Sequence, residues 1–220
     1  MAGRLVHCIS TFFRLQHVVF QQLYGTWRVL ALPTPIVTIF GGAHFDQTDV
    51  YAKQAHELAR KFVDAGVSVL TGGGSGIMQA ASCGALASGK GKGRIMGISV
   101  TDIGEKPNPC VQEFIELDYF YARKWLLTRY AAGFIIFPGG FGTLDELGEV
   151  LTLMQTGKTK RVPLILIGTE FWKPFTQWLK EESLGHGLIT KEGFELMHVT
   201  DDLQDAFCIV RDSCKLPDVT

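Results

Sequence analysis

The chain has 220 residues, which is long enough to bury the core of one α/β domain and short for two. Hydrophobic residues make up 46% of it and charged residues 20%, a composition that excludes an intrinsically disordered chain. Its 21 Lys and Arg balance 22 Asp and Glu, so we expect neither a nucleic-acid polymer nor a membrane as a partner. Any affinity for phosphate must then come from local geometry.

Apolar residues recur at helical spacing within residues 1–32, at Phe12, Phe13, Leu15, Val18, Val19 and Leu23. Interruptions by Arg14, Gln16 and His17 argue against a signal peptide or a membrane span. We expect an N-terminal helical extension that ends near Gly25 and packs on the domain, residues 33–220, or on a partner subunit. The predicted location is cytoplasmic.

Short apolar runs predict buried strands at 36–40, 67–70, 95–100, 114–117, 134–137 and 163–167. Helices are predicted at 48–65, 77–88, 118–132, 143–155, 171–182 and from 201 onward. Alternation of apolar strands with helices is typical of a parallel sheet covered on both faces. The predicted fold is therefore one doubly wound, Rossmann-like α/β domain with a mostly parallel sheet, which binds ligands where its strand order reverses.

Cysteine and histidine are sparse and irregularly spaced. The cysteines at positions 8, 83, 110, 208 and 214 form no Cys-x-x-Cys pair, which predicts buried or free thiols in a reducing compartment. The six histidines form no His-x-x-x-His pair. We therefore expect no metal site.

Two of the predicted strand-to-helix loops, residues 72–76 and 138–143, are rich in glycine. Unpaired N–H groups at a helix N-terminus bind phosphate, and glycine lets the phosphate approach them closely. Plain turn chemistry is the alternative for either loop. Neither loop has the Walker A or the dinucleotide-binding pattern, so a smaller phosphorylated ligand, such as a nucleoside monophosphate, is favoured.

Residues 138–146 read Pro-Gly-Gly-Phe-Gly-Thr-Leu-Asp-Glu. They match the Pro-Gly-Gly-x-Gly-Thr-x-x-Glu motif of the LOG ("lonely guy") family, long labelled lysine decarboxylase-like, and the resemblance extends over about residues 36–183. It implies a phosphoribohydrolase without a cofactor, which cleaves the N-glycosidic bond of a cytokinin ribotide or AMP to give free base and ribose 5-phosphate. Phe120 stands where plant-type members have Met, and Ala122-Arg123-Lys124 resembles a bacterial branch, so the preferred base stays open.

By position, the resemblance implies Arg123 and Glu146 as the catalytic pair. The substrate-binding residues that it implies are Gly73, Gly74, Glu105, Lys124, Gly139, Gly140, Phe141, Gly142, Thr143 and Thr152. A carboxylate beside the ribose stabilises the positive charge that develops as the C1′–N bond breaks, or orients the attacking water. The local pattern Thr143 to Glu146 also fits a capping box, in which Glu146 only returns a hydrogen bond to its own helix.

Three functions remain open at this point. The first is hydrolysis of a nucleoside monophosphate. The second is a non-catalytic carrier like the molybdenum-cofactor carriers, and the third is a pyridoxal-phosphate decarboxylase, which would need a Schiff-base lysine. We expect a homodimer or higher homo-oligomer, because the N-terminal helix and the aromatic residues of 119–134 are typical of a surface buried between subunits.

Overall fold

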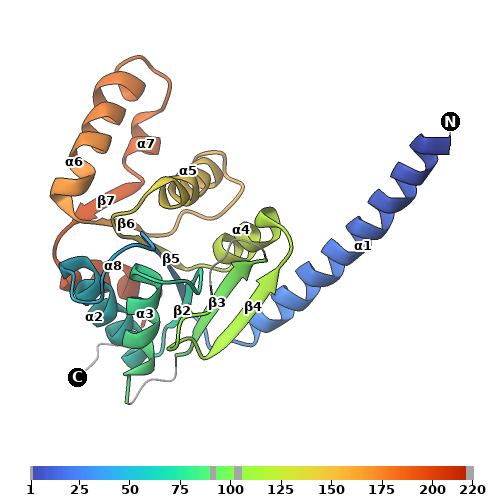
Figure 1. The fold of residues 1–220 in the computed structure, drawn as a ribbon. Coiled ribbons are helices and arrows are strands. Elements are labelled where there is room, and N and C mark those ends of the chain that lie inside the picture. The colour runs from blue at the N-terminus through green and yellow to red at the C-terminus, as the bar shows by residue number, and fades with distance from the viewer. Residues whose placement is uncertain (1, 90–92, 102–105, 217–220) are drawn as a thin grey trace.

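A computed structural model describes residues 2–89, 93–101 and 106–216 of the chain. Seven strands form one parallel sheet in the order β4-β3-β2-β1-β5-β6-β7 (Figure 1). They are β1 (Ile36–Phe40), β2 (Ser68–Thr71), β3 (Ile95–Val100), β4 (Glu113–Leu117), β5 (Gly133–Ile136), β6 (Leu164–Ile167) and β7 (Met197–Thr200). The predicted doubly wound fold is confirmed.

The helices cover both faces of this sheet. They are α1 (Ala2–Leu30), α2 (Val50–Asp64), α3 (Ile77–Leu86), α4 (Phe120–Arg129), α5 (Phe141–Gln155), α6 (Thr169–Trp178), the π-helical η1 (Leu179–Leu184), α7 (Lys191–Phe194) and α8 (Leu203–Ser213). One hydrophobic core lies beneath α2, α3 and α8, and a second beneath α4, α5, α6 and the C-terminal end of α1. None of the described helices is both long and apolar enough to span a bilayer.

The strands are apolar on both sides because both sides are buried. In β1, Val37 and Ile39 point into one core while Ile36 and Phe40 point into the other. The buried Thr38 hydroxyl donates to the carbonyl of Leu127, at 2.7 Å, and so ties β1 to α4. The polar side chain is therefore satisfied inside an apolar layer.

The chain reverses its direction across the sheet between β1 and β5. Strands β1 to β4 are added in one direction, and the chain then returns to place β5 on the other side of β1. Phe40 at the end of β1 pairs with Ile136 at the end of β5. The loops that leave these two strands therefore diverge, and a crevice forms between them.

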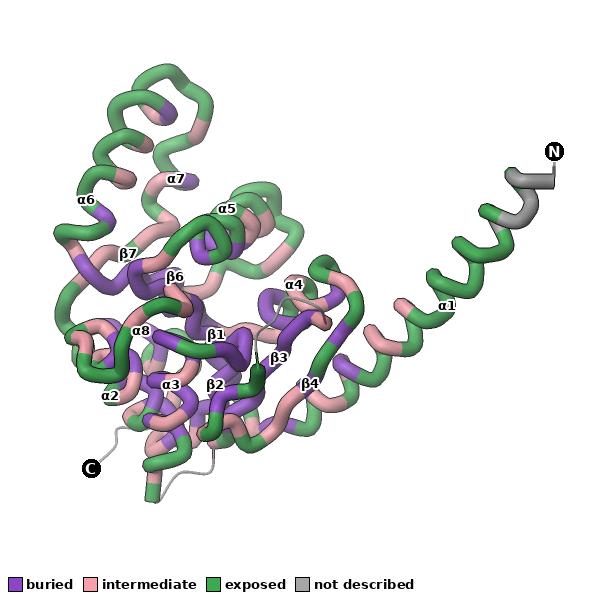
Figure 2. Tube along the Cα trace, in the orientation of Figure 1, coloured by how far each residue is buried: buried purple, intermediate pink, exposed green. Residues whose placement is uncertain are grey.

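The N-terminal helix continues beyond its predicted end. Gly25 lies inside α1, where a Cβ atom would be 2.4 Å from the Leu126 side chain. The glycine thus marks the close contact between α1 and α4 rather than a helix stop. Only the C-terminal part of α1 is partly buried, and the rest projects from the domain (Figure 2).

Two further predictions need correction. Strand β7 and the short α7 were not predicted, because β7 is a four-residue edge strand that is only partly buried. The prediction of free thiols is wrong for Cys83 and Cys110, which form a disulfide between α3 and the segment before β4. Cys208 and Cys214 are free.

Candidate active site

A cavity of about 680 Å³ opens at the carboxyl ends of β1 and β5, where the strand order reverses. Its walls come from the loop after β1, the loop after β5, and helices α3, α4, α5 and α6. The lining residues are Phe40, Gly41, Gly42, Ala43, His44, Phe45, Met78, Phe120, Arg123, Gly139, Gly140, Phe141, Gly142, Thr143, Asp145, Glu146 and Phe171. A nucleoside monophosphate fits the size range of such a site.

The N-terminus of α5 forms one wall of this cavity. The helix begins at Phe141 with Gly140 as its N-cap, and no side chain caps it. The first N–H groups of the helix therefore have no intrahelical partner and carry the positive end of the helix dipole. A Cβ atom on Gly139 would lie 2.9 Å from the backbone nitrogen of Gly42, so only glycine allows this close approach of the two loops.

Glu146 lies on the second turn of α5, on the side that faces the cavity. Its side chain is not part of a capping box, because the helix starts two residues before Thr143; that alternative is wrong. Glu146 is 8% exposed, and its Oε2 has no hydrogen-bond partner among the described residues. Burial raises the pKa of this carboxyl to about 7, although the charges of Lys124 and Arg123 oppose the shift.

Arg123 reaches the same cavity from α4. A Cβ atom on Gly72 would be 2.4 Å from Arg123 Nη2, so the guanidinium rests against the backbone of the loop after β2. Its Nε is buried without a hydrogen-bond partner among the described residues. An unpartnered guanidinium donor and an unpartnered carboxylate oxygen therefore lie in one cavity, which is typical of a site that binds a polar ligand.

Lys124, next in the chain, points to α5. Its ammonium group lies 2.7 Å from Asp145 and 2.9 Å from Glu149. Burial opposes the charge, but the hydrogen bonds to these two carboxylates prevail and raise the pKa of Lys124. The two ion pairs hold α4 against α5 and thereby fix the separation of Arg123 and Glu146.

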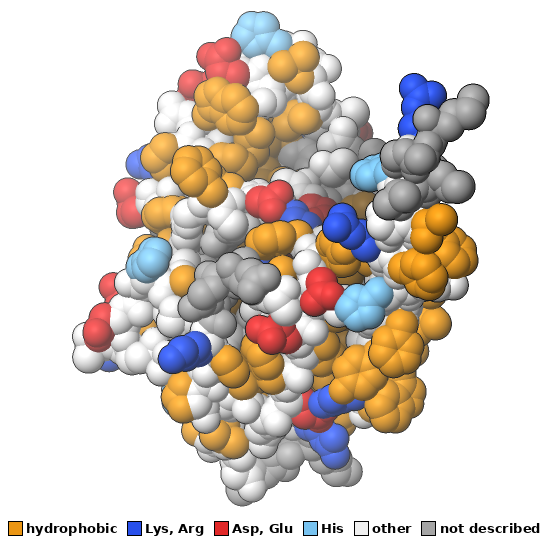
Figure 3. Space-filling view, turned by 45° about the vertical axis from the view of Figure 1, so that its right-hand side comes forward, with side chains coloured by type: hydrophobic (Ala, Val, Ile, Leu, Met, Phe, Trp, Pro, Cys, Tyr) orange, Lys and Arg blue, Asp and Glu red, His pale blue; other side chains and the backbone are white. Residues whose placement is uncertain are grey.

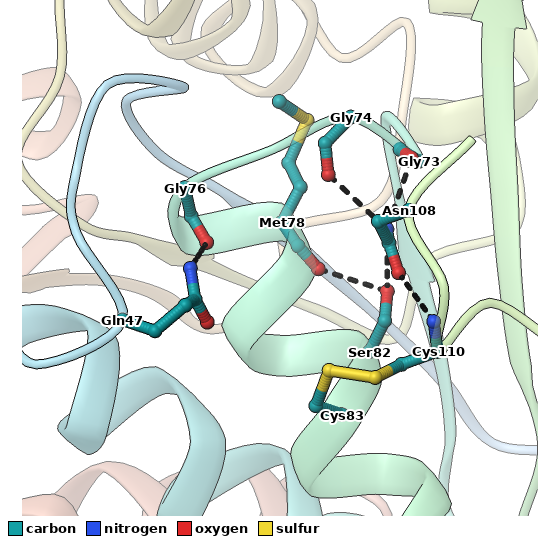
Figure 4. Close-up of a disulfide and its surroundings, with 9 residues drawn as sticks. All are labelled: Gln47, Gly73, Gly74, Gly76, Met78, Ser82, Cys83, Asn108 and Cys110. Atoms are coloured by element: carbon teal, nitrogen blue, oxygen red, sulfur yellow. Dashed lines mark hydrogen bonds between the residues drawn. A yellow bond between two sulfur atoms is a disulfide. The ribbon is translucent and has the colours of Figure 1, made fainter. Parts of the chain in front are cut away.

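The other glycine-rich loop, residues 72–76, is largely buried, and its carbonyl groups are already hydrogen-bonded within the protein. The amide of Asn108 donates to the carbonyls of Gly73 and Gly74, at 2.9 and 3.1 Å, and lies 3.2 Å from the hydroxyl of Ser82 (Figure 4). The Cys83–Cys110 disulfide holds the Asn108 segment against α3 beside these bonds. Gly73 and Gly74 are buried and do not line the cavity.

The predicted site residues thus divide into four groups. Arg123, Glu146 and the run Gly139 to Thr143 line one cavity. Lys124, Gly73 and Gly74 lie behind its wall, and Thr152 is exposed two turns further along α5. Glu105 lies outside the described residues.

Sequence reasoning missed the apolar end of the cavity. Phe45 follows β1, Met78 opens α3, Phe120 opens α4, and Phe171 lies on α6. The sequence predicts a subunit interface for the aromatic residues around Phe120, and an isolated Met such as Met78 carries no signal for a ligand site. His44 and Phe45 had a usable signal, since they follow the Gly41-Gly42 pair at the end of a predicted strand.

No group of three or more potential metal ligands occurs within the ranges that the structure describes. No described lysine lines the cavity, so none is placed to form a Schiff base with a ligand there. The polar groups that line the cavity are therefore the carboxylates of Glu146 and Asp145, the guanidinium of Arg123, the imidazole of His44, the hydroxyl of Thr143 and the N-terminus of α5.

A family profile described as "possible lysine decarboxylase" matches residues 78–210. The chain belongs to this family. It is 28% identical over 186 residues to the cytokinin riboside 5′-monophosphate phosphoribohydrolase of Rhodococcoides fascians, covering 82% of this chain and 92% of that protein. It is also 29% identical over 162 residues to the pyrimidine/purine nucleotide 5′-monophosphate nucleosidase of Escherichia coli K12, covering 70% of this chain but 36% of that longer protein. The profile match, together with the names of these relatives, identifies the chain as a member of the LOG family.

Solved structures show the same fold. The molybdenum cofactor binding protein from Rippkaea orientalis matches with a TM-score of 0.59 and 21% identity, over 81% of this chain and 96% of the other. The molybdenum cofactor carrier protein from Chlamydomonas reinhardtii matches with a TM-score of 0.57 and 24% identity, over 82% and 98%. At these identities the likeness concerns the fold alone.

Proposed function

We propose that this LOG-family chain hydrolyses the N-glycosidic bond of a nucleoside 5′-monophosphate to give free base and ribose 5-phosphate. The observation that carries the proposal is the buried, unpartnered carboxylate of Glu146 in one cavity with Arg123 and the open N-terminus of α5. Each of these three features matches one demand of the reaction: charge stabilisation at the ribose, anion binding, and phosphate binding.

The substrate orientation follows from the polarity of the cavity. The 5′-phosphate accepts hydrogen bonds from the first N–H groups of α5, between Gly140 and Thr143. The base lies at the apolar end against Met78 and Phe120. This orientation brings the anomeric carbon between the two ends, on the side where Glu146 lines the cavity.

Glu146 acts at the anomeric carbon as its bond to the base breaks. Its carboxylate form stabilises the positive charge on the ribose or accepts a proton from the attacking water. The water oxygen becomes the hydroxyl at C1′, and the base leaves with the bonding electron pair and a proton. Arg123 binds an anionic or hydroxyl oxygen of the substrate and does not act as the proton donor, because a guanidinium is a poor general acid.

Two alternatives are less well supported by the cavity. A pyridoxal-phosphate enzyme needs a lysine amine at the cofactor, and no described lysine lines the cavity. A carrier would need only a phosphate-binding site. Here the carboxyl group of Glu146, which has no hydrogen-bond partner at Oε2 among the described residues and a pKa raised to about 7, lines the cavity as well.

Chromatographic assay of base and ribose 5-phosphate tests the proposal, with AMP, CMP and an N6-isopentenyl AMP as substrates. Adenosine is the matched control, because it has the same base and ribose without the phosphate. We expect release from at least one monophosphate and none from adenosine. Tight retention of a monophosphate without turnover would identify a carrier instead. Equal cleavage of adenosine would contradict the assigned phosphate site.

The biological setting is also proposed. A homodimer or higher homo-oligomer remains our prediction. A cytoplasmic location also remains our prediction, and the Cys83–Cys110 disulfide is the observation against it, because disulfides are rare in reducing compartments. Exposed aromatic side chains at Phe120, Tyr121 and Trp125 on α4 support the assembly, because large aromatic side chains are enriched in subunit interfaces.

A further inference from the structure

The N-terminal helix α1 leaves a long apolar face uncovered. Figure 3 shows hydrophobic side chains gathered along it. Large apolar side chains that the helix exposes by 49% to 68% are Ile9, Phe12, Phe13, Leu15, Val19, Phe20, Leu23, Trp27 and Leu30. Monomeric proteins rarely expose a continuous apolar patch of this size, so this face has a partner.

The chain's own domain does not cover this face. It contacts the opposite side of α1, where Gly25 packs on Leu126, Arg28 pairs with Glu113 at 3.1 Å, and His17 lies 3.1 Å from Asp118. Apart from Val29, which is buried in the core at the C-terminal end, the side of α1 that faces the domain is mainly polar or small, and most of its large apolar side chains face away. Over most of its length this is the reverse of an amphipathic helix that packs on its own core.

The spacing of the exposed residues identifies the partner. Seven positions follow one another at strictly alternating intervals of four and three residues: Ile9, Phe13, Gln16, Phe20, Leu23, Trp27 and Leu30. This is the heptad repeat of a coiled-coil seam, which matches a second helix of the same repeat. A lipid surface or an irregular protein groove imposes no such alternation.

The charges agree with pairing of two identical helices. Residues 2–30 contain three arginines and no acidic residue. Arg4, Arg14 and Arg28 all fall at b or f positions of the heptad, which lie outside the seam, so two copies meet without like charges in contact. The exposed area is also sufficient, because the six apolar seam side chains and the flanking Phe12 and Val19, each about half exposed or more, present roughly 800 Å² per copy, the size of a standard stable interface.

We propose that α1 is an association arm whose seam pairs with α1 of a second copy of this chain. Gln16 is the one polar position of the seam. A single polar residue in a coiled-coil seam selects the register and the number of helices at a cost in affinity. Gln16 is therefore the residue that sets the pairing.

Light scattering on the full chain tests this assignment with two matched variants. The triple variant Phe13→Ser, Phe20→Ser and Trp27→Ser changes only the seam. The control Leu15→Ser removes an equally apolar side chain, 57% exposed, that lies off the seam. Circular dichroism and the melting temperature of each variant show that the fold is kept.

We expect the wild-type mass to be at least twice the 24.3 kDa of one chain. The seam variant should have half the wild-type mass, and Leu15→Ser the full wild-type mass. Gln16→Leu should lower the concentration at which the assembly dissociates, by about tenfold or more.

Three results would overturn the assignment. They are a monomeric wild type at tens of micromolar, a seam variant of unchanged mass, or loss of mass by the Leu15→Ser control as well. Flotation of a monomeric wild type with vesicles containing phosphatidylglycerol would assign the face to a lipid surface instead.

Discussion

The two glycine-rich loops of this protein resemble each other in sequence and differ in what surrounds them. The loop after β2 is buried, its Gly73 N–H donates to the Thr71 hydroxyl, and two of its carbonyls accept from Asn108. The loop after β5 is exposed at Gly140, Phe141 and Gly142, and its helix N-terminus has no side-chain cap.

Glycine content alone therefore does not identify a phosphate site. What distinguishes the two loops is whether their hydrogen-bonding groups are already used within the protein. The loop after β2 serves as a wall that supports Arg123 through Gly72, whereas the loop after β5 keeps its donors for a ligand.

The closed loop depends on a covalent link. Replacing Cys83 and Cys110 by serine removes a bridge across 27 positions of sequence. The chain entropy released in the unfolded state then corresponds to a loss of about 3 to 4 kcal/mol of unfolding free energy. Urea unfolding under non-reducing conditions measures it. A Cys208→Ser and Cys214→Ser variant, in which two free and partly buried thiols are changed, should lose much less stability. Equal losses in both variants would contradict this account of the loop.

The helix that follows the open loop, α5, holds the carboxyl group of Glu146 in an environment that disfavours its charged form. Because the folded pKa of Glu146 is raised from 4.5 to about 7, the folded state binds this proton more tightly than the unfolded chain does. Protonated Glu146 therefore contributes its full share of the free energy of unfolding below pH 4.5, and this contribution is lost as the pH rises to about 7. Glu146→Gln should match the wild type near pH 4.5 and exceed it by about 3 kcal/mol above pH 7.5.

Thermal melts from pH 4.5 to 8 check this difference. Glu149→Gln is the matched control on the same helix, since Glu149 pairs with Lys124 and its loss should not stabilise the protein at any pH. A Glu146→Gln variant with no gain above pH 7.5 would show that the carboxyl is not held in an unfavourable environment.

The smallest predicted effects come from alanine substitutions at two glycines of α5, one inside the cavity and one outside it. A Cβ atom on either Gly142 or Gly148 meets no atom within 4 Å. Alanine at each position should therefore stabilise the helix by about 0.5 to 1 kcal/mol. Gly142 lines the cavity and Gly148 does not. Only Gly142→Ala should raise the KM for a monophosphate, by about tenfold for one weakened charged hydrogen bond. Equal KM values for both variants would remove the phosphate from this loop.

The fold was predictable because its signals are local. Short apolar runs separated by helical patterns define the alternation. The helix predicted at 48–65 is α2, Val50–Asp64, and the strand predicted at 95–100 is β3, Ile95–Val100. The failures came from long-range contacts. Gly25 has the sequence signal of a helix stop, but it is needed for the close contact with Leu126. The disulfide joins two cysteines whose spacing carries no signal.

The candidate site was predictable only in part, for the same reason. The motif at residues 138–146 locates the helix N-terminus and Glu146, both on one continuous segment. The apolar wall combines Phe45, Met78 and Phe171, which lie far apart in sequence and meet only through the sheet order. Pattern reasoning on single segments does not find such a wall.

The central claim is that Glu146 performs chemistry at a monophosphate bound between β1 and β5. Single-turnover release of ribose 5-phosphate from a bound monophosphate, compared between the wild type and Glu146→Gln, tests it most directly. We predict a rate lower by about 100-fold or more with substrate affinity retained, because the variant keeps the phosphate site and loses only the acid–base group. Equal rates for the two proteins would contradict the claim.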